Sequence, residues 1–315
     1  MTETSGIDLD RVLPRRRLPS LGLKRRIESL PAPIRLLRPH QWVKNAFVAA
    51  PLFFTPDALG FDNVLRVAAG VMAFCLVASA VYILNDYMDR EADRRHPVKR
   101  ARPIASGAVS PNEALWLFAL TLGGGLAWAT WLDPIFGGLA AVYFLVNVAY
   151  SSGLKDVSIV DVLTITFGFI LRVFAGAELI DVEPSVWIIM CTGLVALFLA
   201  LAKRRDDLAR SLGTGHRQAL AGYTKPFLDA AISVVLGALL VAYIMYTTDS
   251  EVAARLNSEQ LYFTVPFVLA GILRYLQIAL VEERSGAPTM IVLSDRFLIV
   301  CMALWTLAFS LLIYM

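Results

Sequence analysis

The feature that most restricts the fold of this 315-residue chain is a series of apolar blocks separated by polar stretches. Most blocks hold roughly 20 residues, the length that an α-helix needs to cross the hydrocarbon core of a bilayer. Because that core lacks water, each crossing segment must satisfy its own backbone hydrogen bonds, and we expect helices. Counting a short first block that contains Pro51, there are nine: 46–56, 64–84, 114–132, 134–151, 159–180, 186–203, 227–248, 261–281 and 296–315.

The composition also favours an all-α polytopic membrane protein. Hydrophobic residues make up 57% of the chain and charged residues only 17%, whereas soluble domains have about 25% charged residues. The first 45 residues are polar and proline-rich, and they lack the apolar core of a secretion signal. We expect residues 1–38 to form a basic, partly disordered cytoplasmic segment on the membrane surface. Residues 39–315 are expected to form one transmembrane domain.

The distribution of Lys and Arg predicts the orientation in the membrane, because cytoplasmic loops carry the excess of these residues. Loops 85–111 and 204–226 are rich in both, whereas residues 178–185 hold three acids and no cation. The alternation puts the N-terminus in the cytoplasm and the C-terminus outside, which requires an odd number of crossings. It places four loops on the cytoplasmic face: 85–111, 152–158, 204–226 and 282–295.

An acidic cluster follows the second apolar block. Asp86, Asp89 and Asp93 are spaced i, i+3, i+7, so on one continuous helix they project from the same face. Such carboxylates repel one another unless a cation lies between them. Mg²⁺ prefers carboxylate oxygens and usually keeps positions open for substrate phosphates. The spacing therefore predicts a magnesium site, with the three aspartates as the catalytic metal ligands.

Cations follow this cluster directly, and arginine is suited to bidentate contact with phosphate. Together with the predicted metal they indicate a diphosphate-binding site at the membrane interface. The alternative is a solvated loop whose aspartates pair with its own arginines. The cations are Arg94, Arg95, Lys99, Arg100 and Arg102.

The acidic cluster carries a resemblance to a known family. The sequence NDYMDREAD, Asn85 to Asp93, resembles the NDxxDxxxD signature of the UbiA superfamily of intramembrane prenyltransferases. KRARPIASG, Lys99 to Gly107, is similar to the stretch that accompanies it there. The resemblance covers nearly all of the chain from Arg38 onward and implies a bundle of nine transmembrane helices.

Other stretches resemble one branch of that superfamily, the actinobacterial decaprenyl-phosphate phosphoribosyltransferases. They are LRPHQWVKN from Leu37, LAKRRDDL from Leu201, AGYTKPFL from Ala221 and ILRY from Ile272. The branch implies phosphoribosyl pyrophosphate (PRPP) as donor, a polyprenyl (decaprenyl) phosphate as acceptor and Mg²⁺ as cofactor. It also implies a bacterial cytoplasmic membrane, a cytoplasmic active site and a role in cell-wall arabinan synthesis. No nucleic-acid partner is expected, and assembly into a homo-oligomer is left open.

The resemblance implies a second acidic motif after the fourth helix. Here the stretch is YSSGLKDVSIVDV, from Tyr150, and its acids Asp156 and Asp161 are five residues apart. On a continuous helix they point about 140° apart, so they cannot both face one metal. Either Asp156 lies on a loop, or only one acid contributes. A second Mg²⁺ is therefore in doubt, and Lys155 becomes a candidate phosphate ligand.

PRPP carries a 5-phosphate that a prenyl diphosphate lacks, so further anion ligands are expected. Candidates open the first helix, namely Gln41, Lys44 and Asn45, and close the sixth, namely Lys203, Arg204 and Arg205. The alternative for the second group is a positive-inside anchor. The matching stretches also make substrate-binding candidates of Asn85, Tyr150 and Tyr223.

Arg172 lies inside the fifth apolar block, where a charge is costly and usually faces a cavity or an acid. We expect a structural pairing with Asp161 or Glu178, and contact with the substrate is the alternative. Arg66, near the outer end of the second block, is expected to extend to the membrane interface.

The chemistry needs no general base, because the acceptor phosphate is already anionic near neutral pH. The three histidines show no triad-like arrangement. Mg²⁺ neutralises charge on the departing diphosphate, and Lys44, Arg100 or Lys155 add to this stabilisation. Attack opposite the diphosphate is expected to invert C1 of the ribose.

Two other functions compete with this interpretation. The first is a UbiA-type enzyme that uses a prenyl diphosphate donor and an aromatic acceptor. The second is a membrane transporter, which typically places charges or broken helices near mid-membrane. The acids of this chain lie at one edge of the predicted bundle, which favours an enzyme.

Overall fold

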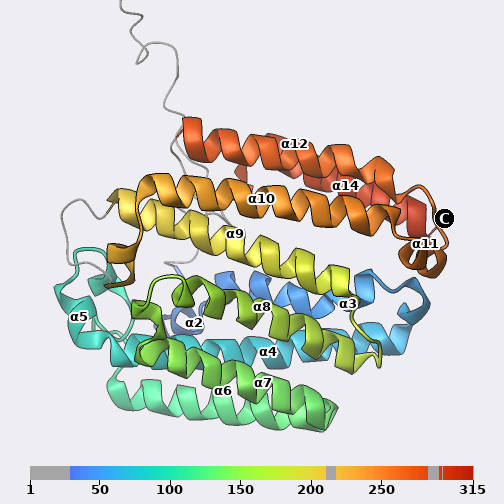
Figure 1. The fold of residues 1–315 in the computed structure, drawn as a ribbon. Helices are drawn as coiled ribbons and strands as arrows, with labels where there is room; N and C mark the ends of the chain where they lie inside the picture. The colour runs from blue at the N-terminus through green and yellow to red at the C-terminus, as the bar shows by residue number, and fades with distance from the viewer. Residues whose placement is uncertain (1–28, 211–217, 283–290, 293, 315) are drawn as a thin grey trace, which may run out of the picture.

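The computed structural model describes residues 29–210, 218–282, 291–292 and 294–314. All regular elements in these ranges are helical, which confirms the predicted all-α class (Figure 1). The predicted disordered segment falls mostly on residues 1–28, outside the described part of the chain.

Eight helices are long and apolar enough to cross a membrane, counted within the described residues. They match eight of the nine predicted blocks. The seventh span, Leu261–Val281, consists of η7 (Leu261–Thr264), α12 (Val265–Leu276) and η8 (Gln277–Val281). The others are α4 (Phe61–Met88), α6 (Pro111–Leu132), α7 (Pro134–Ser152), α8 (Val160–Leu179), α9 (Val186–Arg210), α10 (Lys225–Thr248) and α14 (Arg296–Tyr314).

The first predicted block has a different form from the other eight. After the short helix α2 (Ala32–Leu37), a 3-10 helix η2 spans Pro39–Ala49 and leads into α3 (Ala50–Phe53). A 3-10 helix rises about 2.0 Å per residue and an α-helix about 1.5 Å, so the two pieces together extend about 28 Å. That length approaches the hydrocarbon thickness despite the small number of residues. The ninth crossing stays a prediction, and so does the orientation of the termini.

Because a 3-10 helix has three residues per turn, η2 presents three distinct faces. His40, Val43 and Ala46 are exposed on one face. Trp42, Asn45 and Val48 form a second face: Trp42 and Asn45 hydrogen-bond to α4 and α8, and Val48 is buried in the apolar core. The third face holds Gln41, Lys44 and Phe47, and Phe47 contacts Phe169 of α8 edge to face.

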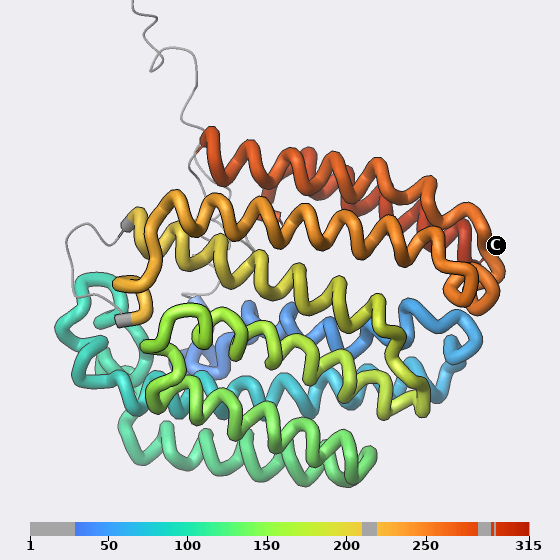
Figure 2. Tube along the Cα trace, viewed as in Figure 1, coloured from blue at the N-terminus to red at the C-terminus, as the bar shows by residue number. Residues whose placement is uncertain are grey.

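Across the bundle, α6 and α7 lie on one side, α4, α8, α9 and α10 lie between, and α12 and α14 lie on the other side (Figure 1, Figure 2). One apolar core joins η2 and α3 with α4, α6, α7 and α8 around Phe74, Phe136 and Leu179. A second core joins α8, α9, α10 and α12 around Ile232 and Tyr275. Helix α8 contributes to both cores and packs directly against α7 and α9.

The described parts of the two charged loops, 85–111 and 204–210 with 218–226, lie at the same end of the bundle, as the sequence predicts (Figure 1). This end holds α5 (Arg90–Arg95), η4 (Lys99–Ala101), η5 (Leu154–Asp156) and η6 (Gln218–Gly222). Ser158 donates a hydrogen bond of 2.7 Å to the Ala219 carbonyl, which ties η5 and η6 together. At the opposite end lie α11 (Ser250–Leu256) and the C-terminus. This end of the bundle is called the charged end below.

Replacing Gly176 by alanine is expected to lower the free energy of unfolding by about 1–3 kcal/mol. A Cβ at this position of α8 would overlap the backbone carbonyl of Val48, which cannot rotate away. Thermal unfolding of the purified protein in detergent measures the loss. Gly168→Ala is the matched control on the same helix, because its Cβ would lie 3.6 Å or more from Tyr143 and Arg172. Equal melting temperatures for both variants would contradict the close contact between α8 and η2.

Candidate active site

The acidic cluster lies where α4 gives way to α5. Helix α4 ends at Met88, Asp89 is its C-cap, and Asp93 belongs to the separate helix α5. The prediction of one continuous helix is therefore wrong at Asp89, because the chain turns there. Asp86 and Asp93 are buried, each with 2% of its surface exposed, whereas the Asp89 side chain is 43% exposed.

Two arginines compensate the buried carboxylates. Nη1 of Arg102 lies 3.0 Å from Asp86 and 2.6 Å from Asp93, and Nη2 of Arg38 lies 2.6 Å from Asp86. A buried carboxylate is costly unless it is paired and hydrogen-bonded. The pairing with an arginine of the same loop, which was part of the alternative interpretation, occurs for Arg102, but both carboxylates are buried and not solvated. Arg38 is a partner that the sequence analysis did not identify.

The arrangement of Asp86 and Asp93 is suited to a divalent cation. Their oxygens converge on one guanidinium nitrogen, so a positive charge between them is already part of the structure. Mg²⁺ is usually held by one or two carboxylates and completed by substrate phosphates. The described residues contain no group of three acidic, His or Cys side chains that would form a complete metal cage. Two carboxylates with open coordination positions therefore fit a metal that binds together with a phosphorylated substrate.

The second polar stretch lies beside the first. Lys155 of η5 is 3.8 Å from Asp89, and Ser151 at the end of α7 donates a 2.5 Å hydrogen bond to Asn85. Asp89 therefore faces Lys155 of the second polar stretch. These contacts bring Asn85 and Lys155 together, as expected for parts of one site.

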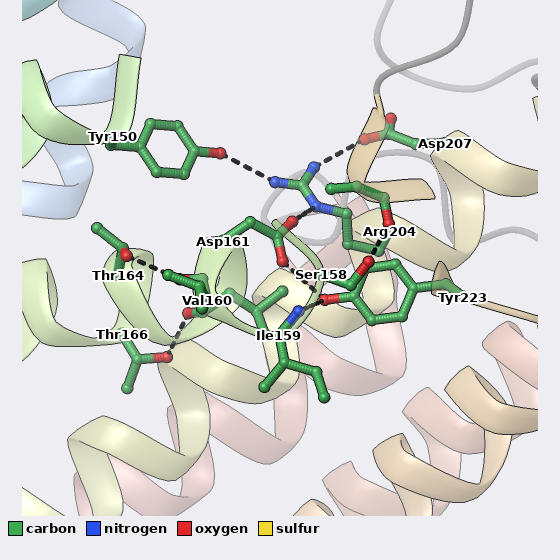
Figure 3. A network of polar contacts seen from close by, with 12 residues as sticks. Tyr150, Ser158, Ile159, Val160, Asp161, Thr164, Thr166, Arg204, Asp207 and Tyr223 are labelled. Atoms are coloured by element: carbon green, nitrogen blue, oxygen red, sulfur yellow. Dashed lines mark hydrogen bonds and ion pairs between the residues drawn. The ribbon is translucent and has the colours of Figure 1, made fainter. Parts of the chain in front are cut away.

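A buried network surrounds Asp161 at the start of α8 (Figure 3). Asp161 has no exposed surface, and one of its oxygens accepts a short hydrogen bond from Nε of Arg204. Its other oxygen accepts a 2.7 Å hydrogen bond from the Tyr223 hydroxyl. Arg204 also donates to Tyr150 at 3.0 Å and to Asp207 at 3.0 Å. Arg204 is 1% exposed, so its guanidinium belongs to the interior of this network.

Tyr223 stabilises an unusual backbone conformation at Ile159, just before α8. Its hydroxyl accepts a 2.6 Å hydrogen bond from the amide of Ile159, whose φ is +71°. A β-branched residue at positive φ is strained, at a cost of about 1–3 kcal/mol. Burial, followed by the hydrogen bond to Asp161, raises the pKa of Tyr223 to about 12, so the hydroxyl keeps its proton at neutral pH. Tyr223 therefore stabilises the turn between η5 and α8.

Arg172 lies in the bundle interior with neutral partners. It donates to Asn45 at 2.9 Å, to Tyr143 at 2.9 Å and to the Gly168 carbonyl at 2.7 Å. It also lies over the rings of Phe74, Tyr143 and Phe169. The expected pairing with Asp161 or Glu178 is wrong. Asp161 pairs with Arg204, and Arg172 is surrounded by amide, hydroxyl and aromatic groups.

The remaining predicted site residues lie in different surroundings. Asn45 is 1% exposed and holds Arg172, so its geometry favours a structural role over substrate contact. Lys44, on the third face of η2, is close enough to Lys203, Arg172 and Arg38 to interact with their charges. No carboxylate pairs with Lys44 within the described part of the chain.

Other predicted residues remain at the margin of the site. Lys99 and Arg100 are exposed on η4, and no acidic partner for them occurs among the described residues. Asp156 is partly exposed on η5, apart from the helix that carries Asp161, which confirms that the two acids belong to different elements. Gln41 is partly exposed on the same face of η2 as Lys44.

Comparison with known proteins identifies the family of the chain. The profile described as the UbiA prenyltransferase family matches residues 45–307. The chain belongs to this family. A solved structure of a UbiA homolog from Archaeoglobus fulgidus, bound to GPP and Mg²⁺, has a TM-score of 0.66. It is 17% identical, and the match covers 90% of this chain and all of that one. At this identity the likeness shows the fold.

Two relatives are similar over most of their length, and both are decaprenyl-phosphate phosphoribosyltransferases. The one from Mycolicibacterium smegmatis is 33% identical over 285 residues, which cover 86% of this chain and 89% of the relative. The one from Corynebacterium glutamicum is also 33% identical, and the match covers 89% and 86% of the two chains. The UbiA protein described here is therefore similar to enzymes of one particular branch across nearly the whole transmembrane domain.

Proposed function

We propose that this UbiA protein transfers a 5-phosphoribosyl group from PRPP to a polyprenyl phosphate and releases diphosphate. The observation that carries this proposal is the similarity to two decaprenyl-phosphate phosphoribosyltransferases over more than four fifths of each chain. The site is compatible with it, because buried acids and arginines lie where a membrane helix ends. A lipid phosphate and a water-soluble donor can meet at such a position.

Asp86 and Asp93 would hold Mg²⁺, which when bound neutralises charge on the departing diphosphate. Arg38 and Arg102 already contact these carboxylates, so a metal taking their place would free both guanidinium groups for phosphate oxygens. Arginine is suited to this exchange, because it binds carboxylate and phosphate with the same paired geometry. Lys155, beside Asp89, adds a third positive charge at the same edge.

The cations around Lys44 support a donor with a second phosphate group. Lys44 and Lys203 lie close enough for their positive charges to interact near the third face of η2. Such a cluster favours a polyanion, and PRPP has its 5-phosphate at the opposite end from its diphosphate. A prenyl diphosphate has an apolar tail at the corresponding end. We therefore assign this cluster to the 5-phosphate.

An apolar groove supports a lipid acceptor. It has a volume of about 370 Å³, opens to the surface between α7 and α8, and is lined by Val146, Leu154, Leu163 and Phe167 among others. Leu154 is adjacent to Lys155, so the groove leads from the surface of the bundle to the charged end. We place the first part of the polyprenyl chain here, with its phosphate toward Lys155. We place the charged end on the cytoplasmic face, as the distribution of Lys and Arg indicates.

Purified protein incubated with radiolabelled PRPP, decaprenyl phosphate and Mg²⁺ is expected to form a lipid-linked ribose phosphate. Extraction into organic solvent followed by chromatography measures the product. Parallel reactions with geranyl diphosphate and 4-hydroxybenzoate test the alternative UbiA chemistry. Prenylation of the aromatic acceptor without transfer from PRPP would contradict the proposal. Accumulation of PRPP in vesicles without turnover would favour a transporter instead.

A further inference from the structure

The stretch that contains Asp156 and Asp161 is the place where the UbiA resemblance leads one to expect a second metal. In the structure, Asp161 of this stretch is bound by other side chains of the protein. Both oxygens of Asp161 are bound, one by Arg204 and the other by Tyr223, and the carboxylate has no exposed surface. A divalent cation could bind Asp161 only after at least one of these two partners had left.

Arg204 is held from three directions. Its Nε contacts Asp161, Nη1 contacts Asp207 and Nη2 contacts the Tyr150 hydroxyl, so every nitrogen of the guanidinium has a partner (Figure 3). These partners come from α7, α8 and α9. Fixing a side chain from several elements keeps its charge in one position with little freedom to move away.

Asp156 does not complete a metal site with Asp161. It lies on η5, before the strained residue Ile159, whereas Asp161 lies inside the first turn of α8. Across the described ranges, no three acidic, His or Cys side chains converge at this stretch. Asp161 and Asp207 contact different nitrogens of Arg204, whereas Asp86 and Asp93 share one nitrogen of Arg102. Because the two acids do not converge on one position and both oxygens of Asp161 are bound, the donor set here does not fit a second divalent cation.

We propose that the guanidinium of Arg204 takes the place of a second divalent cation, so that the enzyme works with one metal, at Asp86 and Asp93. The proposal rests on the proposed function for the identity of the first metal site. A bound metal contributes charge only while it is present, whereas Arg204 contributes a permanent charge. The same guanidinium holds Asp161, which in turn holds Tyr223 and the turn after Lys155. Arg204 is thus a positioning residue for the second polar stretch.

Counting bound Mn²⁺ tests the proposal directly. The full-length protein in detergent, with inorganic diphosphate, is titrated with Mn²⁺ while electron paramagnetic resonance measures the free ion. We expect one Mn²⁺ per chain in the native protein and the same number in Asp161→Asn. Two Mn²⁺ per chain, with the second lost in Asp161→Asn, would overturn the proposal.

Thermal unfolding provides a second measurement that does not depend on the first metal site. Asp161→Asn is expected to lower the Tm by at least about 5 °C in EDTA and by the same amount in saturating Mn²⁺, because its partner is an arginine. A Tm loss that occurs only with Mn²⁺ would show that Asp161 is a metal ligand and would overturn the proposal. Tyr223→Phe, which removes one hydrogen bond and leaves the carboxylate, is expected to show a smaller loss, again independent of the metal.

Asp229→Asn is the matched control for these measurements. Asp229 of α10 forms a short ion pair with Arg205, which is as deeply buried as Arg204, whereas the Asp229 carboxylate is 29% exposed. This variant measures the effect of removing the carboxylate partner of a buried arginine other than Arg204. If no Mn²⁺ binds at all, Asp86 and Asp93 do not form a metal site, and that part of the proposed function is wrong. An equal Tm loss with and without Mn²⁺ for Asp161→Asn would still support the role of Arg204.

Discussion

Replacing Asp86 by asparagine is expected to lower the rate of phosphoribosyl transfer by roughly 10³-fold, or about 4 kcal/mol in transition-state free energy. The substitution keeps the size of the side chain and removes the charge that would bind the metal. It also leaves Arg38 without the carboxylate that it contacts at 2.6 Å. Initial rates of lipid-linked product formation from labelled PRPP measure the loss. Higher Mg²⁺ concentrations are expected to recover only part of it.

Glu91→Gln is the control for this variant. Glu91 lies on α5 within the same charged loop, but it is exposed and pairs with Arg94. Exposed pairs contribute little, so its removal is expected to change the rate by less than about threefold. If Asp86→Asn retained near-native turnover, or if Glu91→Gln lost as much, Asp86 would not be a metal ligand of the reaction.

Replacing Arg172 by methionine is expected to destabilise the protein by about 2–4 kcal/mol. The variant loses three hydrogen bonds from a charged donor and leaves the Asn45 and Tyr143 acceptors without a partner in an apolar interior. Part of this loss is offset because a buried charge no longer has to be accommodated. The Tm in detergent measures stability, and donor KM measures whether η2 shifts when Asn45 loses its partner.

Arg66→Met is the matched control, since it makes the same change at an exposed position of α4. Arg66 donates one 3.3 Å hydrogen bond to the Leu132 carbonyl and has no buried partner within the described residues. We expect its stability to change by less than about 0.5 kcal/mol. Similar losses for both variants would mean that any arginine in this bundle contributes as Arg172 does.

Most of the fold follows from the sequence, because a bilayer imposes a minimum length on each apolar block. Eight of the nine predicted blocks correspond to helices, and α4 extends the predicted 64–84 only to Phe61–Met88. The grouping of the charged loops at one end follows from the alternation of Lys and Arg. The short block 46–56 is harder to interpret, because apolar length alone does not reveal a helix that rises faster per residue.

The acidic motif predicts which residues form the site better than it predicts how they pair. Asp86 and Asp93 converge as their spacing indicates, but the turn at Asp89 directs that side chain to Lys155. Side chains that pair across long sequence separations leave no pattern in the sequence around either residue. Nothing near Arg38 in the sequence indicates Asp86, and nothing near Arg172 indicates Asn45. These contacts depend on how helices pack.

The threefold winding of η2 makes this segment unusually sensitive to changes in length. Inserting one residue before Lys44 would turn every later side chain by about 120° relative to its surroundings, whereas in an α-helix the step is about 100° and the faces are broader. Lys44 would then move from the third face of η2 to the exposed face or to the face that packs on α4 and α8. Insertions or deletions of three residues would restore the register of the faces, so length variation in this segment is expected to occur in multiples of three.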